Sequence, residues 1–379
     1  MCWTRVAQKY PKELCLDLAW AMAAQMGLTP KQPKLHVAHC AKCTNARVGE
    51  AQNPGPRHAA PRVARDVQQL EEVRLVNKQT QVLQDRVWAD FNNWVCSVVS
   101  LAAAEQLFLC PQLAVDVLVN YGKSRFAAGA PMYEFRHLLV LAQQSQAGLR
   151  AHMTPAWRLL SKWEAVQPLQ HRQPLPEVLF RAMFVVGMLW GWRRWSATLL
   201  LGFEGIARIG EVLRASRADL VLPCDSCDSV TGVAFLRVLK PKSSRRGKGR
   251  IQHLKIADAN AVSFLEHVFG PLEFSLQLFP LSAGVFRRRW DKILEALLVP
   301  KSRRPTPASI RGGGAILAYK RGEPISDILW RMRLVSLTTL ESYLQELAAD
   351  SLLTRLPERS RCRIRSAAAL FDLQLRSPG

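Results

Sequence analysis

Four side chains in the second half of the sequence have the types needed for chemistry on a phosphodiester: Arg208, Lys242, Arg311 and Tyr343. A guanidinium grips phosphate through a planar fork of N–H donors. A tyrosine hydroxyl can hold a phosphoryl group covalently, and a lysine can protonate a leaving oxygen. The set therefore predicts DNA strand exchange through a phosphotyrosine.

Each of these residues also has a simpler interpretation. Arg208 could pair with Glu211 or Glu204 instead of a phosphate. Tyr343 could be an ordinary core or surface tyrosine. The chemical interpretation therefore depends on the elements that would position the set.

The elements around Arg311 and Tyr343 are predicted to be helices. Thr306-Pro307 is a helix start signal, which places Arg311 about one turn inside a helix. Gly312, Gly313 and Gly314 follow, and glycines inside a helix indicate a close approach by another helix or by a DNA backbone. Thr338-x-x-Glu341 is a capping-box pattern that opens a helix containing Tyr343, which flanks the apolar face of that helix.

Arg208 is expected on a rigid platform. The segments Val178–Gly191 and Ser196–Phe203 are apolar nearly all round and predict buried helices, and Gly205 permits a turn before a short helix that runs from Arg208 to Asp219. Downstream, 232–239 and 251–256 alternate like two strands of a hairpin. A further helix is expected at Phe286–Leu298.

Basic side chains are concentrated at the hairpin tip and on that further helix. We predict DNA contacts from Lys240, Arg245, Arg246, Lys248, Arg250, Arg287, Arg288 and Arg289. Lys242 is the preferred general acid at the base of the hairpin, with Lys240 as the second choice. The alternative role for most of these side chains is solubility.

The overall charge agrees with a polyanionic partner. The 379-residue chain carries 52 Lys and Arg against 30 Asp and Glu, a formal net charge of +22, and its pI is about 10.2. Such a field favours nucleic acid, or less often an acidic membrane surface; the alternative is a basic surface without a partner. No transmembrane span is predicted. The nine scattered cysteines are expected to be reduced thiols in an intracellular compartment.

Composition divides the chain into five segments. Residues 1–61 are expected to be a weakly ordered extension and linker, 62–166 a helical bundle, 167–176 a proline-rich linker, 177–350 an α+β domain and 351–379 a tail helix. The predicted fold is mainly α with a small β-hairpin or sheet. His36, His39, Cys40 and Cys43 could seat one zinc ion, but no second pair follows nearby, so we predict no metal site and no cofactor.

The order of Arg208 in RIGEVL, the lysine hairpin, Arg311 in SIRGG, and Tyr343 resembles the tyrosine recombinases of the phage-integrase type over about residues 65–350. The resemblance is nearest to the DIRS-like and Crypton-like recombinases of eukaryotic mobile elements. It implies that the helical bundle is a core-binding domain and that the following domain is catalytic. It also implies that both close on double-stranded DNA as a clamp, and that the tail helix docks either on a neighbouring protomer or on its own domain.

Two positions depart from the family's pattern. The family has a histidine three residues before the second arginine and a histidine or tryptophan about nine residues before the tyrosine; here those positions hold Ala308 and Leu334, with Trp330 one turn earlier. Three hypotheses follow: an active strand transferase, a DNA-binding protein derived from one, or a basic RNA-binding or scaffold protein. Nuclear localisation follows from the mobile-element resemblance if the source is eukaryotic, and cytoplasmic localisation otherwise.

Overall fold

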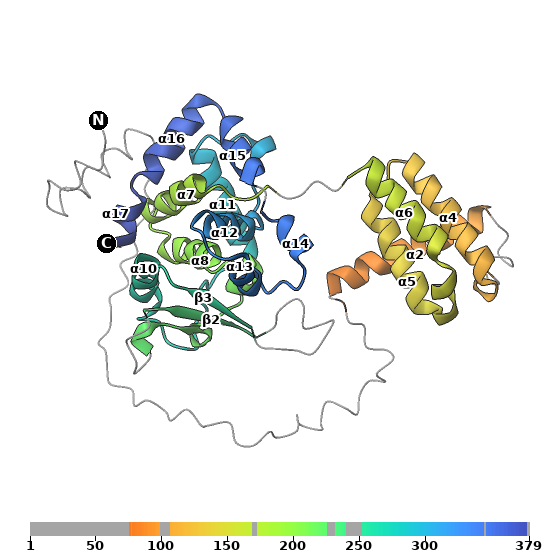
Figure 1. The fold of residues 1–379 in the computed structure, drawn as a ribbon, viewed down its shortest axis with the longest axis horizontal. Coiled ribbons are helices and arrows are strands. Elements are labelled where there is room, and N and C mark those ends of the chain that lie inside the picture. Colours follow the sequence, from red (N-terminus) through yellow and green to blue (C-terminus); the bar gives the residue numbers. More distant parts are fainter. Residues whose placement is uncertain are drawn as a thin grey trace, which may run out of the picture. The chain divides into compact units, whose positions relative to one another are not determined.

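The computed structural model of the chain describes residues 76, 78–98, 107–168, 173–225, 232–239, 252–344 and 346–376, and these fall into two compact units divided between residues 170 and 171 (Figure 1). The division lies within the proline-rich run 167–176. The predicted zinc-ligand candidates at residues 36–43 and the basic hairpin tip at residues 240–251 lie outside the described residues.

The first unit is a helical bundle. It consists of α2 (Lys78–Val98), α4 (Pro111–Ala127), α5 (Met132–Ser145) and α6 (Thr154–Val166), with short 3₁₀ helices at Leu107–Leu109 and Ala147–His152. Its core is built from Phe91, Leu118, Phe135 and neighbouring apolar side chains at helical spacing. Pro111 opens α4, where its missing N–H would have had no helical partner.

The second unit is mainly helical with one small antiparallel sheet, which confirms the predicted fold class. Its helices are α7 (Glu177–Leu189), α8 (Arg193–Glu204), α9 (Ile209–Val212), α10 (Ala259–Phe269), α11 (Ala283–Ala296), α12 (Ser309–Lys320), α13 (Ile325–Met332), α14 (Leu337–Glu341), α15 (Glu346–Thr354), α16 (Glu358–Ala368) and α17 (Phe371–Arg376). The sheet has the order β1 (Leu220–Val221), β2 (Ala234–Val238), β3 (Gln252–Ile256), with Leu236 opposite both Leu220 and Leu254. Single-turn 3₁₀ helices lie at Arg217–Asp219, Pro223–Asp225 and Lys301–Arg303.

The apolar helices α7 and α8 form the centre of this unit (Figure 1). Their side chains are buried on nearly every face, as their composition predicts. Phe180 of α7 stacks on Phe203 of α8 with ring centroids 3.9 Å apart, and α10, α12 and α16 pack around the pair. Asp258 caps α10, because its Oδ1 accepts from the Ala261 N–H at 2.9 Å.

The prediction of one helix from Arg208 to Asp219 was wrong. The helix α9 is a single turn, and a second local turn replaces its continuation. The cause is Ser216, whose N–H and hydroxyl both donate to Asp219 Oδ2, at 3.0 and 2.9 Å. Such side-chain to backbone bonding competes with helix formation.

The prediction that Tyr343 lies inside a helix was also wrong. The helix α14 ends at Glu341, and Tyr343 lies in the turn that follows. The Tyr343 N–H donates to the Leu340 carbonyl at 2.8 Å, so an i→i−3 bond tightens and closes the helix end. Similarly, Thr306 and Pro307 precede α12 by a turn, so Arg311 is the third residue of that helix.

The tail contains α16 and α17 in place of the single helix predicted for 351–379, because Pro357 is the N-cap of α16 and a turn at Ala369 separates α16 from α17. Both tail helices pack on their own unit: α16 lies against α7, and Phe371 of α17 contacts Phe180 and Phe184 edge-on. Of the two docking arrangements considered for the tail, this chain therefore shows the intramolecular one. No described helix has the length and apolar character to cross a membrane.

The glycines of α12 allow the close approach that the sequence indicated, and the approaching groups are this protein's own. A Cβ on Gly313 would lie 2.2 Å from the Leu175 carbonyl oxygen, and one on Gly314 would lie 2.1 Å from the Phe203 carbonyl oxygen. A side chain at either position would force these backbone carbonyl groups to move, which costs free energy. We therefore expect Gly313→Ala to lower the free energy of unfolding by roughly 1–3 kcal/mol, measured by urea denaturation.

Gly312→Ala is the matched control, since a Cβ there would meet Pro174 Cβ at an ordinary 3.4 Å. The gain in helix propensity should keep its unfolding free energy within about 1 kcal/mol of wild type. Equal effects at the two positions would contradict close packing as the reason for the glycines.

Candidate active site at Arg311 and Tyr343

Arg311 connects α12 to the turn that carries Tyr343. Its guanidinium carbon lies 5.6 Å from the centroid of the Tyr343 ring, within cation–π range. Its Nη2 donates to the Met332 carbonyl at the end of α13. The structure thus brings together two of the residues predicted from the sequence, which lie in different elements.

The buried guanidinium of Arg311 has unused donors. The residue is 3% exposed, and its Nε and Nη1 are buried without a hydrogen-bond partner among the described residues. Arg217 provides the contrast, because it is equally buried but donates to the Phe269 and Leu220 carbonyls and to Asp225. Arg217 is therefore satisfied by the protein itself, whereas Arg311 keeps donors that could bind an anion.

The electrostatics of Arg311 agree with this interpretation. Burial, followed by the charges of Arg208 and Arg333, lowers the pKa of Arg311 to about 10. A phosphate at this point would reverse the effect, because its negative charge favours the protonated guanidinium. Since the pKa stays well above 7, Arg311 is a cation at neutral pH.

Arg208 is held by the end of α8. Ile206 adopts a left-handed conformation with φ of 50°, and the Ala207 N–H bonds the Gly202 carbonyl at 2.9 Å in the pattern of a Schellman motif. A β-branched residue with positive φ is strained, and such strain is concentrated at functional sites. This tight turn places Arg208 at the start of α9 with its side chain one-third exposed.

Glu211 joins Arg208 to a further arginine. Its carboxylate accepts from Arg208 Nη1 at 3.0 Å and from Arg333 Nη2 at 2.6 Å. Burial would raise the pKa of Glu211, but Arg333 and Arg208 together lower it below its ordinary value. The pairing of Arg208 with Glu211 considered from the sequence is therefore present, and it belongs to a larger arginine cluster, defined here as Arg208, Arg311, Arg333 and Glu211.

Arg333 was not predicted from the sequence. It follows α13 with φ of 55°, in a second Schellman motif in which the Leu334 N–H bonds the Leu329 carbonyl at 3.0 Å. Glycine is the usual residue at such a helix end. The sequence signal for Arg333 is an arginine at a helix end where glycine is favoured, and this signal can be used only once the end of α13 is known.

Tyr343 is supported by a small apolar cluster. Ile328, Met332 and Leu340 are among its buried members, and Leu334 and Tyr343 are partly buried side chains that pack against the cluster. Leu334 thus packs against the same cluster as Tyr343, and its side chain offers no proton donor. Trp330 is 62% exposed and lies outside this cluster, and Ala308 precedes α12 without a side-chain hydrogen bond.

The remaining predicted residues lie either on α11 or in the hairpin tip. Arg287 pairs with Asp291, Arg289 lies over the Trp192 ring, and Arg288 lies on α11 with them. The lysines and arginines of the hairpin tip, Lys242 included, fall between β2 and β3 in residues 240–251, outside the described residues. Among the residues that the structure describes, no group of three or more His, Cys, Asp or Glu could hold a metal ion.

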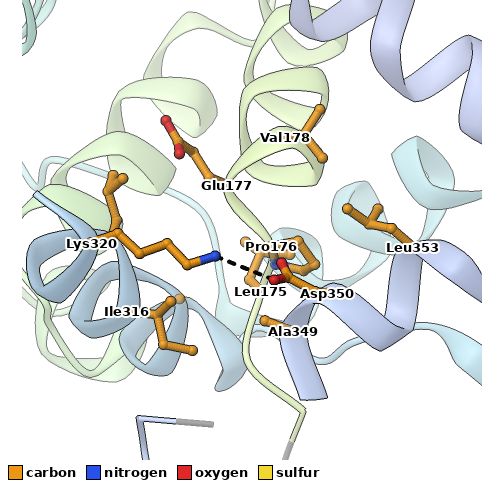
Figure 2. A pocket seen from close by; sticks show the side chains of 11 residues that line it. Leu175, Pro176, Glu177, Val178, Ile316, Lys320, Ala349, Asp350 and Leu353 are labelled. Atoms are coloured by element: carbon orange, nitrogen blue, oxygen red, sulfur yellow. Dashed lines mark hydrogen bonds and ion pairs between the residues drawn. The ribbon is translucent and has the colours of Figure 1, made fainter. Parts of the chain in front are cut away.

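A separate cavity of about 200 Å³ lies beside α12 (Figure 2). The start of α7, one face of α12 and α15 form its walls, and Lys320 pairs with Asp350 across it at 3.4 Å. Its wall includes Ile316, Leu353 and Val178 but no residue of the arginine cluster. Besides its apolar side chains the wall carries Glu177 and the Lys320–Asp350 ion pair, so it has no excess positive charge to select phosphate, and the arginine cluster remains the candidate active site.

Among solved structures, the crystal structure of XerA recombinase is similar to this chain. It shares 14% sequence identity, with a TM-score of 0.36, and the match covers 72% of this chain and 99% of that one. No protein-family model matches the sequence. No curated protein matches it either. A similarity this low supports no functional statement, so a function must be argued from the geometry of the site.

Proposed function

We propose that this protein is a DNA strand transferase of the tyrosine-recombinase type, which cleaves and rejoins DNA through a 3′-phosphotyrosyl intermediate. The observation that carries the proposal is the position of the Arg311 guanidinium over the Tyr343 ring, with two buried donors lacking a partner among the described residues. A tyrosine beside unsatisfied arginine donors combines an attacking oxygen with fixed positive charge that can stabilise a phosphoryl-transfer transition state. The resemblance to DIRS-like and Crypton-like recombinases extends the proposal to a mobile-element enzyme acting in a nucleus.

The proposed reaction is a balanced phosphoryl exchange. Tyr343 Oη forms a bond to the scissile phosphorus and releases its proton to water, while the bond to the 5′-oxygen breaks and that oxygen takes up a proton. Lys242 is our proposed donor of that proton. Because the phosphotyrosyl bond retains the phosphodiester energy, the new 5′-hydroxyl can attack it to rejoin the strand without ATP.

The arginines supply the charge that this reaction needs. A tyrosine hydroxyl has an ordinary pKa of about 10 and is a weak nucleophile at neutral pH. Arg311 and Arg208 would stabilise the negative charge that develops on the non-bridging oxygens, in a partly buried site where fixed charges act strongly. Their rigid attachment to helix ends keeps the reorganisation during reaction small.

A DNA-binding protein without chemistry is the second candidate. It is favoured by Ala308 and Leu334, since neither side chain can move a proton and the loss of a general acid or base lowers rates by about 10²–10⁴-fold. The same arginine cluster would then hold a backbone phosphate without cleaving it. The two candidates differ in one measurable product, the covalent adduct.

The deciding experiment uses nicked duplexes, from which the short strand downstream of the cleavage point diffuses away and traps the intermediate. The substrate is a pool of nicked duplexes of random sequence, so that no target sequence has to be chosen in advance. An adduct that survives denaturation and contains 3′-phosphotyrosine supports the transferase. DNA binding without any adduct across the pool would exclude it and leave the second candidate.

DNA affinity of the full chain should fall steeply with salt. Its net charge is +22, and we propose phosphate contacts from the hairpin tip and from Arg287 to Arg289. If six or more such contacts form, raising the salt concentration from about 50 to 200 mM should weaken DNA binding by about 10³-fold or more, measured by fluorescence anisotropy. Replacing Arg245, Arg246 and Lys248 by Gln should reduce the slope of log K against log salt by about 0.9 for each phosphate that is no longer neutralised. A salt-independent affinity would contradict binding through the phosphates.

A further inference from the structure

We propose that Arg333 is a third phosphate-binding arginine of this site, an inference that rests on the proposed function and deepens it. Arg333 is 7% exposed at its side chain, and one of its nitrogens, Nη2, donates to Glu211 at 2.6 Å. Its Nε and Nη1 are buried and have no hydrogen-bond partner among the described residues. Buried donors of a charged group without partners are rare, and they indicate a ligand that completes them.

The charges of the arginine cluster favour an anionic ligand. The cluster holds three guanidiniums and one carboxylate, that of Glu211, which accepts from Arg208 and Arg333. Arg311 has no acidic hydrogen-bond partner among the described residues, and both other arginines act on it electrostatically. An excess of buried positive charge is unfavourable unless an anion joins it. The planar forks of arginine match the oxygens of a phosphate.

The backbone around Arg333 points to the same role. Arg311 donates to the carbonyl of Met332, the residue immediately before Arg333, so the two guanidiniums are attached to one helix end. Arg333 holds its left-handed conformation although glycine would adopt it without strain. Non-glycine residues in such strained backbone conformations are concentrated at functional sites. The next residue, Leu334, packs in the apolar cluster and provides no donor, so Arg333 is the polar contribution of this turn to the site.

The simpler role is structural: Arg333 could serve only to neutralise Glu211. The two roles make different predictions for Arg333→Gly. Glycine relieves the strain at φ of 55°, so the variant should fold, while the guanidinium is lost. A purely structural arginine would leave phosphate binding unchanged after its removal, whereas a phosphate ligand would not.

The test measures binding of inorganic phosphate and of phenyl phosphate to the full chain by calorimetry. We expect wild type to bind both, and Arg333→Gly to bind them about ten- to hundredfold more weakly, as for the loss of a charged hydrogen bond. Arg333→Lys retains the charge without the fork and should fall between the two. Arg331→Met is the matched control, because Arg331 lies on α13 but bonds Glu323 and the Glu204 carbonyl, outside the arginine cluster.

Each outcome of this test supports or overturns the role of Arg333. Unchanged phosphate affinity in a folded Arg333→Gly protein, equal losses in Arg333→Gly and Arg331→Met, or no phosphate binding by wild type would overturn it. If Arg333→Gly fails to fold, Arg333→Lys decides alone, since wild-type affinity in that variant would exclude a role for the fork. The adduct assay separates this role from the proposed function. If phosphate binding depends on Arg333 but no adduct forms, the phosphate-binding role of Arg333 stands and the transferase is rejected. If wild type and Arg333→Gly give equal adduct yields, the transferase stands and the role of Arg333 is rejected.

Discussion

Tyr343→Phe is expected to abolish the covalent protein–DNA adduct while leaving the fold and DNA affinity unchanged. The substitution removes only the hydroxyl oxygen, which is the proposed attacking atom. The aromatic ring remains over Arg311 and against the small apolar cluster, so the packing of the turn after α14 is retained. The adduct should fall below detection on denaturing gels, since no other group in the proposed reaction forms the bond to phosphorus.

Tyr319→Phe provides the control for this prediction. Tyr319 is an exposed tyrosine near the end of α12, with no described contact to the arginine cluster. Its variant should form adduct at the wild-type rate. If Tyr343→Phe retains the adduct, the nucleophile is another residue and the role proposed for Tyr343 is wrong.

Arg311→Met is expected to lower the rate of adduct formation by at least about 10²-fold, the effect of removing one preorganised donor to a developing negative charge. The same change should leave the free energy of unfolding within about 1 kcal/mol of wild type or raise it. The reason is that Arg311 is a buried cation whose Nε and Nη1 have no partner among the described residues, so an apolar side chain of similar length relieves desolvation. Loss of activity with undiminished stability is the signature of a residue that serves function.

Arg217→Met tests the opposite case. Arg217 is as buried as Arg311, but its donors are used by carbonyls and by Asp225, so its loss should lower the free energy of unfolding by roughly 3 kcal/mol or more. Urea denaturation of the two variants measures the difference directly. If Arg311→Met destabilises the protein as much as Arg217→Met, the unpartnered donors of Arg311 would have a structural explanation.

Both predictions start from residues that could be chosen in the sequence. Arg311 follows a helix start signal and precedes three glycines, and Tyr343 follows a short apolar pattern, so their chemistry and approximate settings were open to local reasoning. The boundaries were less accurate. Tyr343 lies in a turn and α9 is a single turn, because backbone hydrogen bonds at Leu340 and side-chain bonds at Ser216 ended helices that periodicity alone would continue.

The sequence by itself determined the fold class, the buried apolar helices α7 and α8, and the residue types that could act on a phosphate. These depend on composition, period and local capping, which are properties of neighbouring residues. Only the tertiary structure decided that Glu211 bonds both Arg208 and Arg333, which is 122 positions from Glu211 in the chain. It also decided that Arg311 lies over Tyr343 with two donors unused among the described residues. Such contacts arise where helix ends meet in space. The left-handed conformation of Arg333 at the end of α13 is likewise decided by packing, because arginine has no local preference for that conformation.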